Sequence, residues 1–355
     1  MHRTSLDVAE RAARSVRLRY LAENQLTIRR EGSPGRFRYR DRAGRVIRDA
    51  RTRARIDALV LPPAWKDVRI AAHANGHLQA IGRDARGRKQ YRYHERWRET
   101  RDEAKFERLL KFAACLPQIR RRIASDLKRR QFDRRRVLAC VLRLLDSTGL
   151  RIGNEEYART NHSFGLTTLK DRHVKVRAGK ATFQFVGKSG IEFDVEVDDP
   201  RVAKLIKKCQ DLPGQHLFQY RDEYGRRRKL GSTDVNRYLQ ELTGETFTAK
   251  DFRTWRGSVL AAALVAEAEP AQSATQAKRT LVAVVKEVAG ELGNTAAVCR
   301  ASYIHPAILA SYADAIGGST TTKVRVAKRV RGLHAAELAL LRVLRTAKSD
   351  RRRAG

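Results

Sequence analysis

Residues 173–197 read HVKVRAGKATFQFVGKSGIEFDVEV. Apolar and polar residues alternate in three short runs, which is the period of a half-buried β-strand. Two turn segments, Ala178-Gly179-Lys180 and Gly187-Lys188-Ser189-Gly190, separate the runs. The pattern predicts a three-stranded antiparallel meander with Lys188 at a hairpin tip, where a side chain can reach into a neighbouring groove.

Helical patterns lie on both sides of this meander. Residues 105–148 predict two or three helices, one of them buried nearly all round. Downstream, Ser232 can cap one helix, and Thr248 with Asp251 resembles a capping box that opens the next. That next helix would carry Arg253 in its early turns, near the end that favours anions.

A further series of helices leads to Tyr303. Residues 273–292 predict a helix that Gly293 ends. Thr295 can cap a short helix that finishes around Tyr303, and Pro306 can start another.

The domain organisation is predicted from changes of pattern. Residues 1–97 predict a small β-rich domain, because short alternating segments and turns dominate from Leu26 to Tyr93. Residues 98–316 predict a larger, mainly α-helical domain that contains the meander. Residues 317–355 predict a flexible joint followed by a basic C-terminal helix. The expected fold class is therefore α+β.

The composition indicates a folded protein with a polyanionic partner. The 355 residues include 75 Lys+Arg against 39 Asp+Glu, which gives a formal net charge of +36, and 42% of them are hydrophobic, enough for a real core. Such an excess of positive charge favours DNA or RNA, with an anionic membrane as the competing partner. No apolar run approaches the roughly 18 residues that a spanning helix needs, and the N-terminus leads into no signal-peptide core.

The sequence encodes neither a metal site nor a disulfide framework. The four cysteines form no CxxC pair, which favours reduced thiols and a cytoplasmic, nucleoid-associated location. They are Cys115, Cys140, Cys209 and Cys299. His73 and His77 have the spacing of a helical metal pair, but Asn75 and Gly76 between them disfavour the helix that such a pair needs.

Tyr303 and three cations form the candidate catalytic set. Arg151, Lys188 and Arg253 are far apart in the sequence, yet each lies in a local pattern that presents it. Taken singly, Arg151 fits a surface arginine, Lys188 an ordinary turn lysine and Tyr303 a core tyrosine. Taken together in a strongly basic chain, a phenol with three cations indicates covalent phosphoryl chemistry on a nucleic acid.

Six segments carry a resemblance to a known family. They are Gln90-Tyr91-Arg92-Tyr93-His94, Gly149-Leu150-Arg151-Ile152-Gly153-Asn154-Glu155, Phe164-Gly165-Leu166-Thr167-Thr168-Leu169, Val186-Gly187-Lys188-Ser189-Gly190, Lys250-Asp251-Phe252-Arg253-Thr254-Trp255, and Gly293-Asn294-Thr295 through Ser302-Tyr303-Ile304-His305-Pro306. In this order the chain resembles type IB DNA topoisomerases of the poxvirus-like bacterial group, over most of residues 20–315.

The resemblance implies an isomerase that relaxes supercoiled duplex DNA without ATP or an obligatory metal. Tyr303 would attack a phosphodiester to give a 3′-phosphotyrosyl link, and the broken strand would swivel before it is resealed. Arg151 and Arg253 would hold the phosphate oxygens, because a guanidinium is a charged planar fork. Asn294, where many relatives have His, would add a neutral hydrogen bond. Lys188 would protonate the leaving 5′-oxygen, with a pKa lowered by neighbouring arginines.

The resemblance also implies where the small domain contacts DNA. Gln90, Tyr91 and Tyr93 match the stretch that touches DNA in relatives, and Gln can read adenine while Tyr can contact phosphate or base. Alternation along this strand makes one of the two tyrosines a candidate for inward packing. Relatives act as monomers and bind no nucleotide cofactor. Gly187-Lys188-Ser189 does resemble the end of a P-loop, but Thr182 occupies the place of its leading Gly.

Two other functions stay open at the level of the sequence. Tyrosine recombinases use the same nucleophile and arginines, but they typically carry His-x-x-Arg where this chain has Lys250-Asp251-Phe252-Arg253. An architectural DNA-binding protein without catalysis would fit the charge alone. Relaxation of a supercoiled plasmid without ATP or metal separates the enzyme from the binder.

Overall fold

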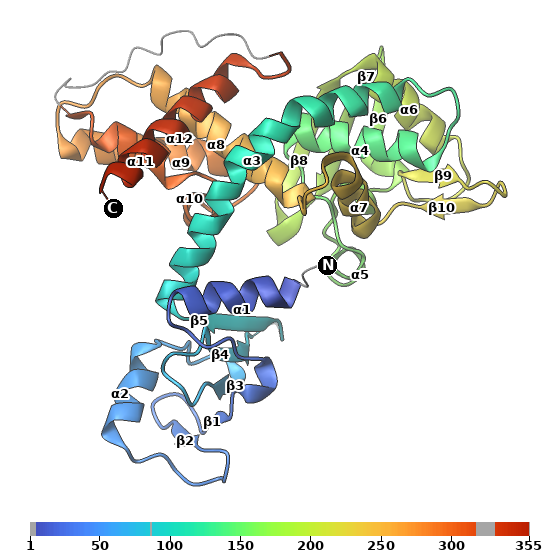
Figure 1. The fold of residues 1–355 in the computed structure, drawn as a ribbon. Helices are drawn as coiled ribbons and strands as arrows, with labels where there is room; N and C mark the ends of the chain where they lie inside the picture. The colour runs from blue at the N-terminus through green and yellow to red at the C-terminus, as the bar shows by residue number, and fades with distance from the viewer. Residues whose placement is uncertain (1–4, 86, 317–330, 355) are drawn as a thin grey trace. The chain divides into compact units, whose positions relative to one another are not determined.

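The chain divides into two compact units. The computed structural model describes residues 5–85, 87–316 and 331–354. Unit 1 is Met1–Phe106 and unit 2 is Glu107–Gly355, so the division falls inside helix α3 (Glu95–Leu127), whereas the sequence placed a boundary near residue 98 (Figure 1). The joint expected at 317–320 lies outside the described residues.

Unit 1 is built on a five-stranded antiparallel sheet. The strands lie in the order β2-β1-β3-β4-β5, so β2 and β5 are its edges. They are β1 (Ile28–Glu31), β2 (Arg38–Arg40), β3 (Lys66–Ile70), β4 (Leu78–Arg83) and β5 (Lys89–Tyr93). Helices α1 (Ser5–Ser15) and α2 (Ala50–Ala58) and the 3₁₀ turn η1 (Glu23–Gln25) accompany the sheet. Asp49 begins α2 by accepting the Thr52 N–H at 2.7 Å, and Ile56 of α2 is buried in a cluster with Ile70.

The three-stranded meander in unit 2 confirms the prediction from residues 173–197. Strands β6 (Val174–Arg177), β7 (Lys180–Val186) and β8 (Glu192–Asp198) pair antiparallel in that order. Phe183 lies opposite Val174 on one side and Val195 on the other, and its side chain is fully buried. Helix α6 (Pro200–Gln210) packs on β6 and β7. The α+β fold class is thereby confirmed.

Unit 2 has further helices, of which α4 is buried nearly all round as its sequence predicted, with α6, α7 and α8 packed against it. They are α4 (Arg134–Thr148), α5 (Glu155–Thr160), α7 (Ser232–Thr243), α8 (Ala249–Glu267), α9 (Ala274–Leu292), α10 (Ala296–Ser302), α11 (Pro306–Ala313) and α12 (Ala335–Ala354). Short 3₁₀ turns lie at Leu166–Thr168 (η2), Asp171–His173 (η3) and Lys188–Gly190 (η4). The predicted ends at Gly293 and Thr295 are observed, with Gly293 left-handed (φ 58°) and the Thr295 side chain accepting the Val298 N–H.

Two local features differ from the sequence analysis. Gly231, not Ser232, is the N-cap of α7, because the Asp234 carboxylate reaches back to the Gly231 N–H at 2.9 Å and leaves Ser232 inside the helix. The hairpin of β9 (Gln219–Arg221) and β10 (Arg227–Lys229) has no counterpart in the predictions. Exposed basic residues fill β10, so it lacks the apolar alternation that reveals a half-buried strand.

The C-terminal helix α12 belongs to the core of unit 2. The sequence grouped it with the joint in a separate segment, 317–355. In the structure it packs against α8 and α11 (Figure 1), and its Leu340, Leu341 and Leu344 are buried with the rest of the core. Among the described residues, no helix is long and apolar enough to cross a bilayer.

A buried hydrogen bond between α3 and α7 should contribute measurably to stability. Tyr238 is fully buried and its hydroxyl donates to Asp126 at 2.5 Å. Tyr238→Phe leaves that carboxylate short of a partner, so we expect the free energy of unfolding in urea to fall by about 1–3 kcal/mol. Tyr224→Phe, at a tyrosine that is 71% exposed, is the matched control and should change nothing. Equal stability of the two variants would contradict this account.

Candidate active site

Tyr303 lies at the C-terminal end of α10, held from two sides. Its N–H donates to the Cys299 carbonyl at 2.9 Å, and its own carbonyl accepts from the Ser258 hydroxyl of α8 at 3.1 Å. Gly257 of α8 lies directly beneath, since a Cβ there would come within 2.8 Å of the Tyr303 carbonyl oxygen. The guanidinium of Arg253, also on α8, stands 5.0 Å from the centre of the Tyr303 ring. Helix α8 therefore positions both the phenol and its neighbouring cation.

Arg253 is a buried cation with an unpaired donor. Its side chain donates to the carbonyls of Gly149 and of Leu292, the latter at 2.8 Å. Burial lowers the pKa of Arg253, and the neighbouring Tyr303 opposes that shift. Among the described residues nothing accepts the buried Nε hydrogen.

Arg151 reaches the same place from the loop after α4. It donates to the Gly293 carbonyl at 2.8 Å, to the Leu292 carbonyl at 3.5 Å and to Oδ1 of Asn294 at 2.5 Å. Burial and repulsion from Arg253 lower the pKa of Arg151 to about 10, which leaves it protonated at neutral pH. The C-terminal end of α9, the negative end of its dipole, thus collects both arginines together with Asn294.

Lys188 is not brought into contact with these groups. It is exposed at the tip of the β7–β8 hairpin, and among the described residues it forms no hydrogen bond or ion pair. The ring of Phe193 connects the hairpin to the site, since a Cβ at Gly187 would lie 2.6 Å from it and a Cβ at Gly293 would overlap it. The structure therefore brings Arg151, Arg253 and Asn294 together near Tyr303. It leaves Lys188 on the exposed tip of a hairpin that Phe193 connects to the end of α9.

The three expected DNA contacts of unit 1 lie on its edge strand β5. The Tyr91 hydroxyl donates to Glu23 at 3.0 Å and the Gln90 amide donates to Asp84 at 2.9 Å. Tyr91 and Tyr93 are two residues apart, so they share a face of the strand, and their rings stack at 6.0 Å. Tyr91 is exposed, while Tyr93 packs partly against the core.

His77, one of the two histidines whose spacing the sequence analysis weighed, lies in the core of unit 1. His77 is buried, stacks on Tyr20 with ring centroids 4.2 Å apart, and accepts the Leu21 N–H at 3.0 Å. It behaves as a core histidine. In the part of the chain that the structure describes, no group of three or more His, Cys, Asp or Glu residues is arranged to hold a metal ion.

Sequence reasoning missed several residues that shape the site. Gly257 and Ser258 hold the Tyr303 segment, and Phe193 spaces the hairpin from α9. A signal was present for Gly257, because a glycine inside a helical pattern weakens the helix and can mark a close approach of another backbone. Phe193 was assigned only as a strand residue, since a strand pattern does not say what its side chain meets.

Comparison with known proteins identifies the family. Residues 94–330 match the model for eukaryotic DNA topoisomerase I, catalytic core, and residues 36–84 match that for bacterial DNA topoisomerase IB, N-terminal domain. The chain is 35% identical over 257 residues to the DNA topoisomerase 1B of Acanthamoeba polyphaga mimivirus, an overlap covering 70% of this chain and 76% of the relative. It is 22% identical over 262 residues to the DNA topoisomerase 1B of vaccinia virus (strain Copenhagen), covering 73% and 78% of the two chains.

The chain therefore belongs to the type IB DNA topoisomerase family, as the resemblance predicted. It is an isomerase that relaxes supercoiled DNA, and the phosphotyrosyl intermediate is characteristic of this family. These matches favour neither a recombinase nor an architectural binder.

The close approach at Gly293 should make that position intolerant of a side chain. Gly293→Ala forces a left-handed alanine into the Phe193 ring, so we expect a loss of about 1–2 kcal/mol in the free energy of unfolding from the backbone alone. The matched control is Gly290→Ala inside α9, the helix that Gly293 ends. A Cβ there meets nothing, and the higher helix propensity of alanine should raise the free energy of unfolding by up to about 1 kcal/mol. Urea unfolding of both variants measures the difference, and an unchanged Gly293→Ala protein would refute the close approach.

Proposed function

We propose that Tyr303 is the nucleophile of this topoisomerase and that Arg151, Arg253 and Asn294 bind the phosphodiester that it attacks. The observation that carries this proposal is their convergence on the C-terminal end of α9. Arg253 stands over the Tyr303 ring, and Arg151 bonds Asn294 beside it. Three hydrogen-bond donors beside one phenol are what phosphoryl transfer to a tyrosine requires.

The reaction exchanges one ester for another. The Tyr303 oxygen forms a bond to phosphorus as the bond to the 5′-oxygen breaks, giving a 3′-phosphotyrosyl link and a free 5′-hydroxyl. The phenol loses its proton and the leaving oxygen gains one. The 5′-hydroxyl later attacks the new ester and reverses each of these changes. The ester keeps the energy of the broken bond, which is why we expect no need for ATP.

The two arginines supply positive charge where the transition state accumulates negative charge. Fixed donors aimed at the non-bridging phosphate oxygens would stabilise that charge as the Tyr303 oxygen attacks. Both guanidinium groups are already held in place by the backbone carbonyls of Leu292 and Gly293, so they need little reorganisation when phosphate arrives. The amide of Asn294 can add a hydrogen bond from Nδ2, because its Oδ1 already accepts from Arg151.

Lys188 is proposed as the general acid for the leaving 5′-oxygen. An ammonium at a hairpin tip can reach a bound strand, and Phe193 anchors the hairpin beside Gly293.

We propose further that the N-terminal domain contributes DNA contacts through Gln90, Tyr91 and Tyr93. The enzyme is proposed to act as a monomer on duplex DNA in the cytoplasm, at the nucleoid, without a nucleotide cofactor. The net charge of +36 supports a DNA partner.

Replacement of the nucleophile provides the direct test. Tyr303→Phe should abolish both relaxation of supercoiled plasmid and the covalent protein–DNA band on a denaturing gel, in buffer with EDTA and no ATP. Tyr224→Phe, which removes an exposed hydroxyl elsewhere, should keep both activities. A covalent band from the Tyr303→Phe protein would assign the nucleophile to another residue.

Proton donation by Lys188 can be distinguished from a purely electrostatic effect of its positive charge. Lys188→Ala should slow cleavage of an ordinary duplex by on the order of 10²–10³, since proton donation to the leaving oxygen is lost. A duplex with sulfur in place of that 5′-oxygen should be cleaved at nearly the wild-type rate, because a thiolate leaves without being protonated. Lys175→Ala, an exposed lysine of β6, is the control and should cleave both substrates normally. Equal slowing of the two substrates by Lys188→Ala would exclude general acid catalysis.

A further inference from the structure

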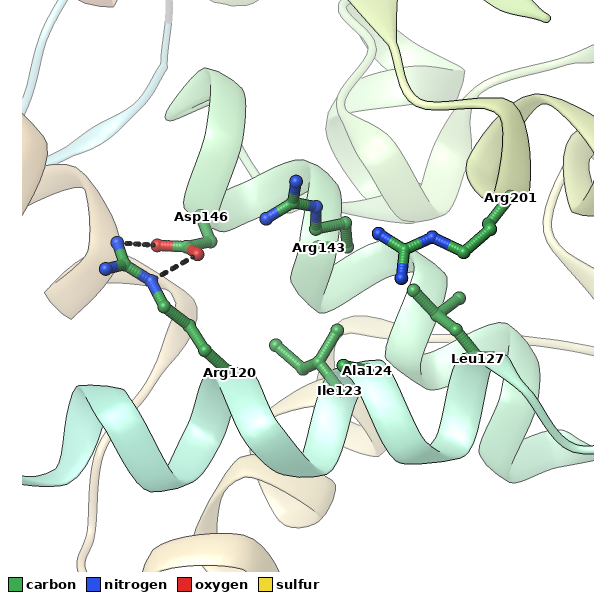
Figure 2. Close-up of a pocket in the computed structure, with 7 residues that line it drawn as sticks. All are labelled: Arg120, Ile123, Ala124, Leu127, Arg143, Asp146 and Arg201. Atoms are coloured by element: carbon green, nitrogen blue, oxygen red, sulfur yellow. Dashed lines mark hydrogen bonds and ion pairs between the residues drawn. The ribbon is translucent and has the colours of Figure 1, made fainter. Parts of the chain in front are cut away.

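Arg120 of α3 lies at the centre of a buried ionic network. Its Nε and Nη2 donate to Asp146 of α4 at 2.8 and 2.9 Å, as Figure 2 shows, and its Nη2 and Nη1 donate to Glu337 of α12 at 2.8 and 2.9 Å. Nη1 also donates to the Gly332 carbonyl at 2.8 Å. All five donors of the guanidinium are thus paired. The adjoining cavity of about 30 Å³ is large enough only for water, so the network itself is the notable feature.

Glu337 is the residue through which this network reaches the active-site helix. It is 4% exposed, and besides Arg120 its carboxylate accepts the indole N–H of Trp255 at 2.8 Å and the His334 N–H at 2.8 Å. Burial alone would raise the pKa of Glu337, but the hydrogen bonds from Arg120, His334 and Trp255 outweigh it and lower that pKa. Glu337 is therefore a carboxylate at neutral pH and binds α12, α3 and α8 together.

The side of α8 that Glu337 holds is not the side that carries Arg253. Trp255 follows Arg253 by two residues, which places their side chains on roughly opposite sides of the helix. Trp255 meets the carboxylate of α12, while Gly257 and Ser258 contact the Tyr303 segment and Arg253 covers its ring. A rotation of α8 about its axis would therefore move Trp255 and the residues that contact Tyr303 together.

We propose that Glu337 is a positioning residue for cleavage: by fixing Trp255 it sets the rotation of α8, and so places Arg253 against Tyr303. The proposal rests on the function assigned above to those two residues. It makes the C-terminal helix α12 a part of the catalytic apparatus, although none of its side chains needs to touch DNA. A displacement of about 1 Å at a reacting group can lower a rate by on the order of 10²-fold.

The test compares two buried carboxylates in the full-length protein. Glu337→Gln keeps an oxygen for Trp255 but turns an amide N–H₂ towards Arg120, which breaks the network. Asp199→Asn is the matched control: the Asp199 side chain is 6% exposed and pairs with Arg143 of α4 and Arg201 of α6, and among the described residues it forms no hydrogen bond or ion pair with α8. Single-turnover cleavage of a duplex and the Kd for non-covalent DNA binding are measured well below the melting temperature of each variant.

We expect Glu337→Gln to cleave about 10-fold to 100-fold more slowly than wild type, with its DNA affinity within about 2-fold. Asp199→Asn should cleave at the wild-type rate within about 2-fold, even where its melting temperature falls equally. The proposal is overturned if both variants cleave alike, or if cleavage and DNA affinity fall together in Glu337→Gln. Should the wild-type protein form no covalent adduct, the assignment of Tyr303 fails instead, so the two failures are distinguishable.

Trp255→Phe gives a second measurement, in which the negative charge of Glu337 is kept. It keeps an aromatic ring in the core and removes the indole N–H that binds Glu337, together with the rest of the five-membered ring. We expect cleavage to slow in this variant. The double variant Trp255→Phe with Glu337→Gln should be no slower than Glu337→Gln alone, because the two changes interrupt one chain of hydrogen bonds from Trp255 through residue 337 to Arg120, the first at the indole and the second at Arg120. Multiplicative slowing in the double variant would refute positioning through this contact.

Discussion

The carbonyl groups at the C-terminal end of α9 hold the site together. The Leu292 carbonyl accepts from Arg253 at 2.8 Å and from Arg151 at 3.5 Å, and the Gly293 carbonyl accepts from Arg151 at 2.8 Å. Two partly buried guanidinium groups repel each other, which is one reason why the pKa of Arg151 is low. The oxygens at the negative end of the helix dipole offset that repulsion. The protein can therefore keep two positive charges beside Tyr303 before any phosphate neutralises them.

This arrangement depends on close approaches that only glycine permits. A Cβ at Gly165 would lie 2.6 Å from the Arg151 carbonyl oxygen, and one at Gly257 would lie 2.8 Å from the Tyr303 carbonyl oxygen. Gly293 combines a left-handed backbone with contact to the Phe193 ring. The loop that carries Arg151, the helix that carries Arg253 and the hairpin that carries Lys188 can thus meet at one helix end.

Helix α8 connects this centre to the rest of unit 2. Its Ser258 contacts the Tyr303 segment, and its Trp255 binds the network of Arg120, Asp146 and Glu337. A buried charge set of this kind contributes geometric definition more reliably than net stability, because desolvation offsets much of the attraction between the charges. That balance fits a role in orientation.

The sequence alone determined those features that local patterns encode. Alternation in 173–197 specified the meander, Gly293 and Thr295 marked where one helix ends and the next begins, and the ordered motifs around Arg151, Arg253 and Tyr303 identified the family. Each of these depends on neighbours within a few residues, or on a motif whose order along the chain is itself the signal. This is why they could be predicted without coordinates.

Only the tertiary structure decided which distant groups meet. Arg120 and Glu337 are 217 residues apart, so nothing local marks them as partners. The leucine-bearing helix α12 has the local pattern of a tail, and only its packing against α8 places it in the core. Lys188 was expected among the arginines but lies on an exposed tip, because turn chemistry specifies a hairpin and not what the hairpin faces. Pairing across long sequence separations is set by packing of the whole core, and that is the information a local pattern does not contain.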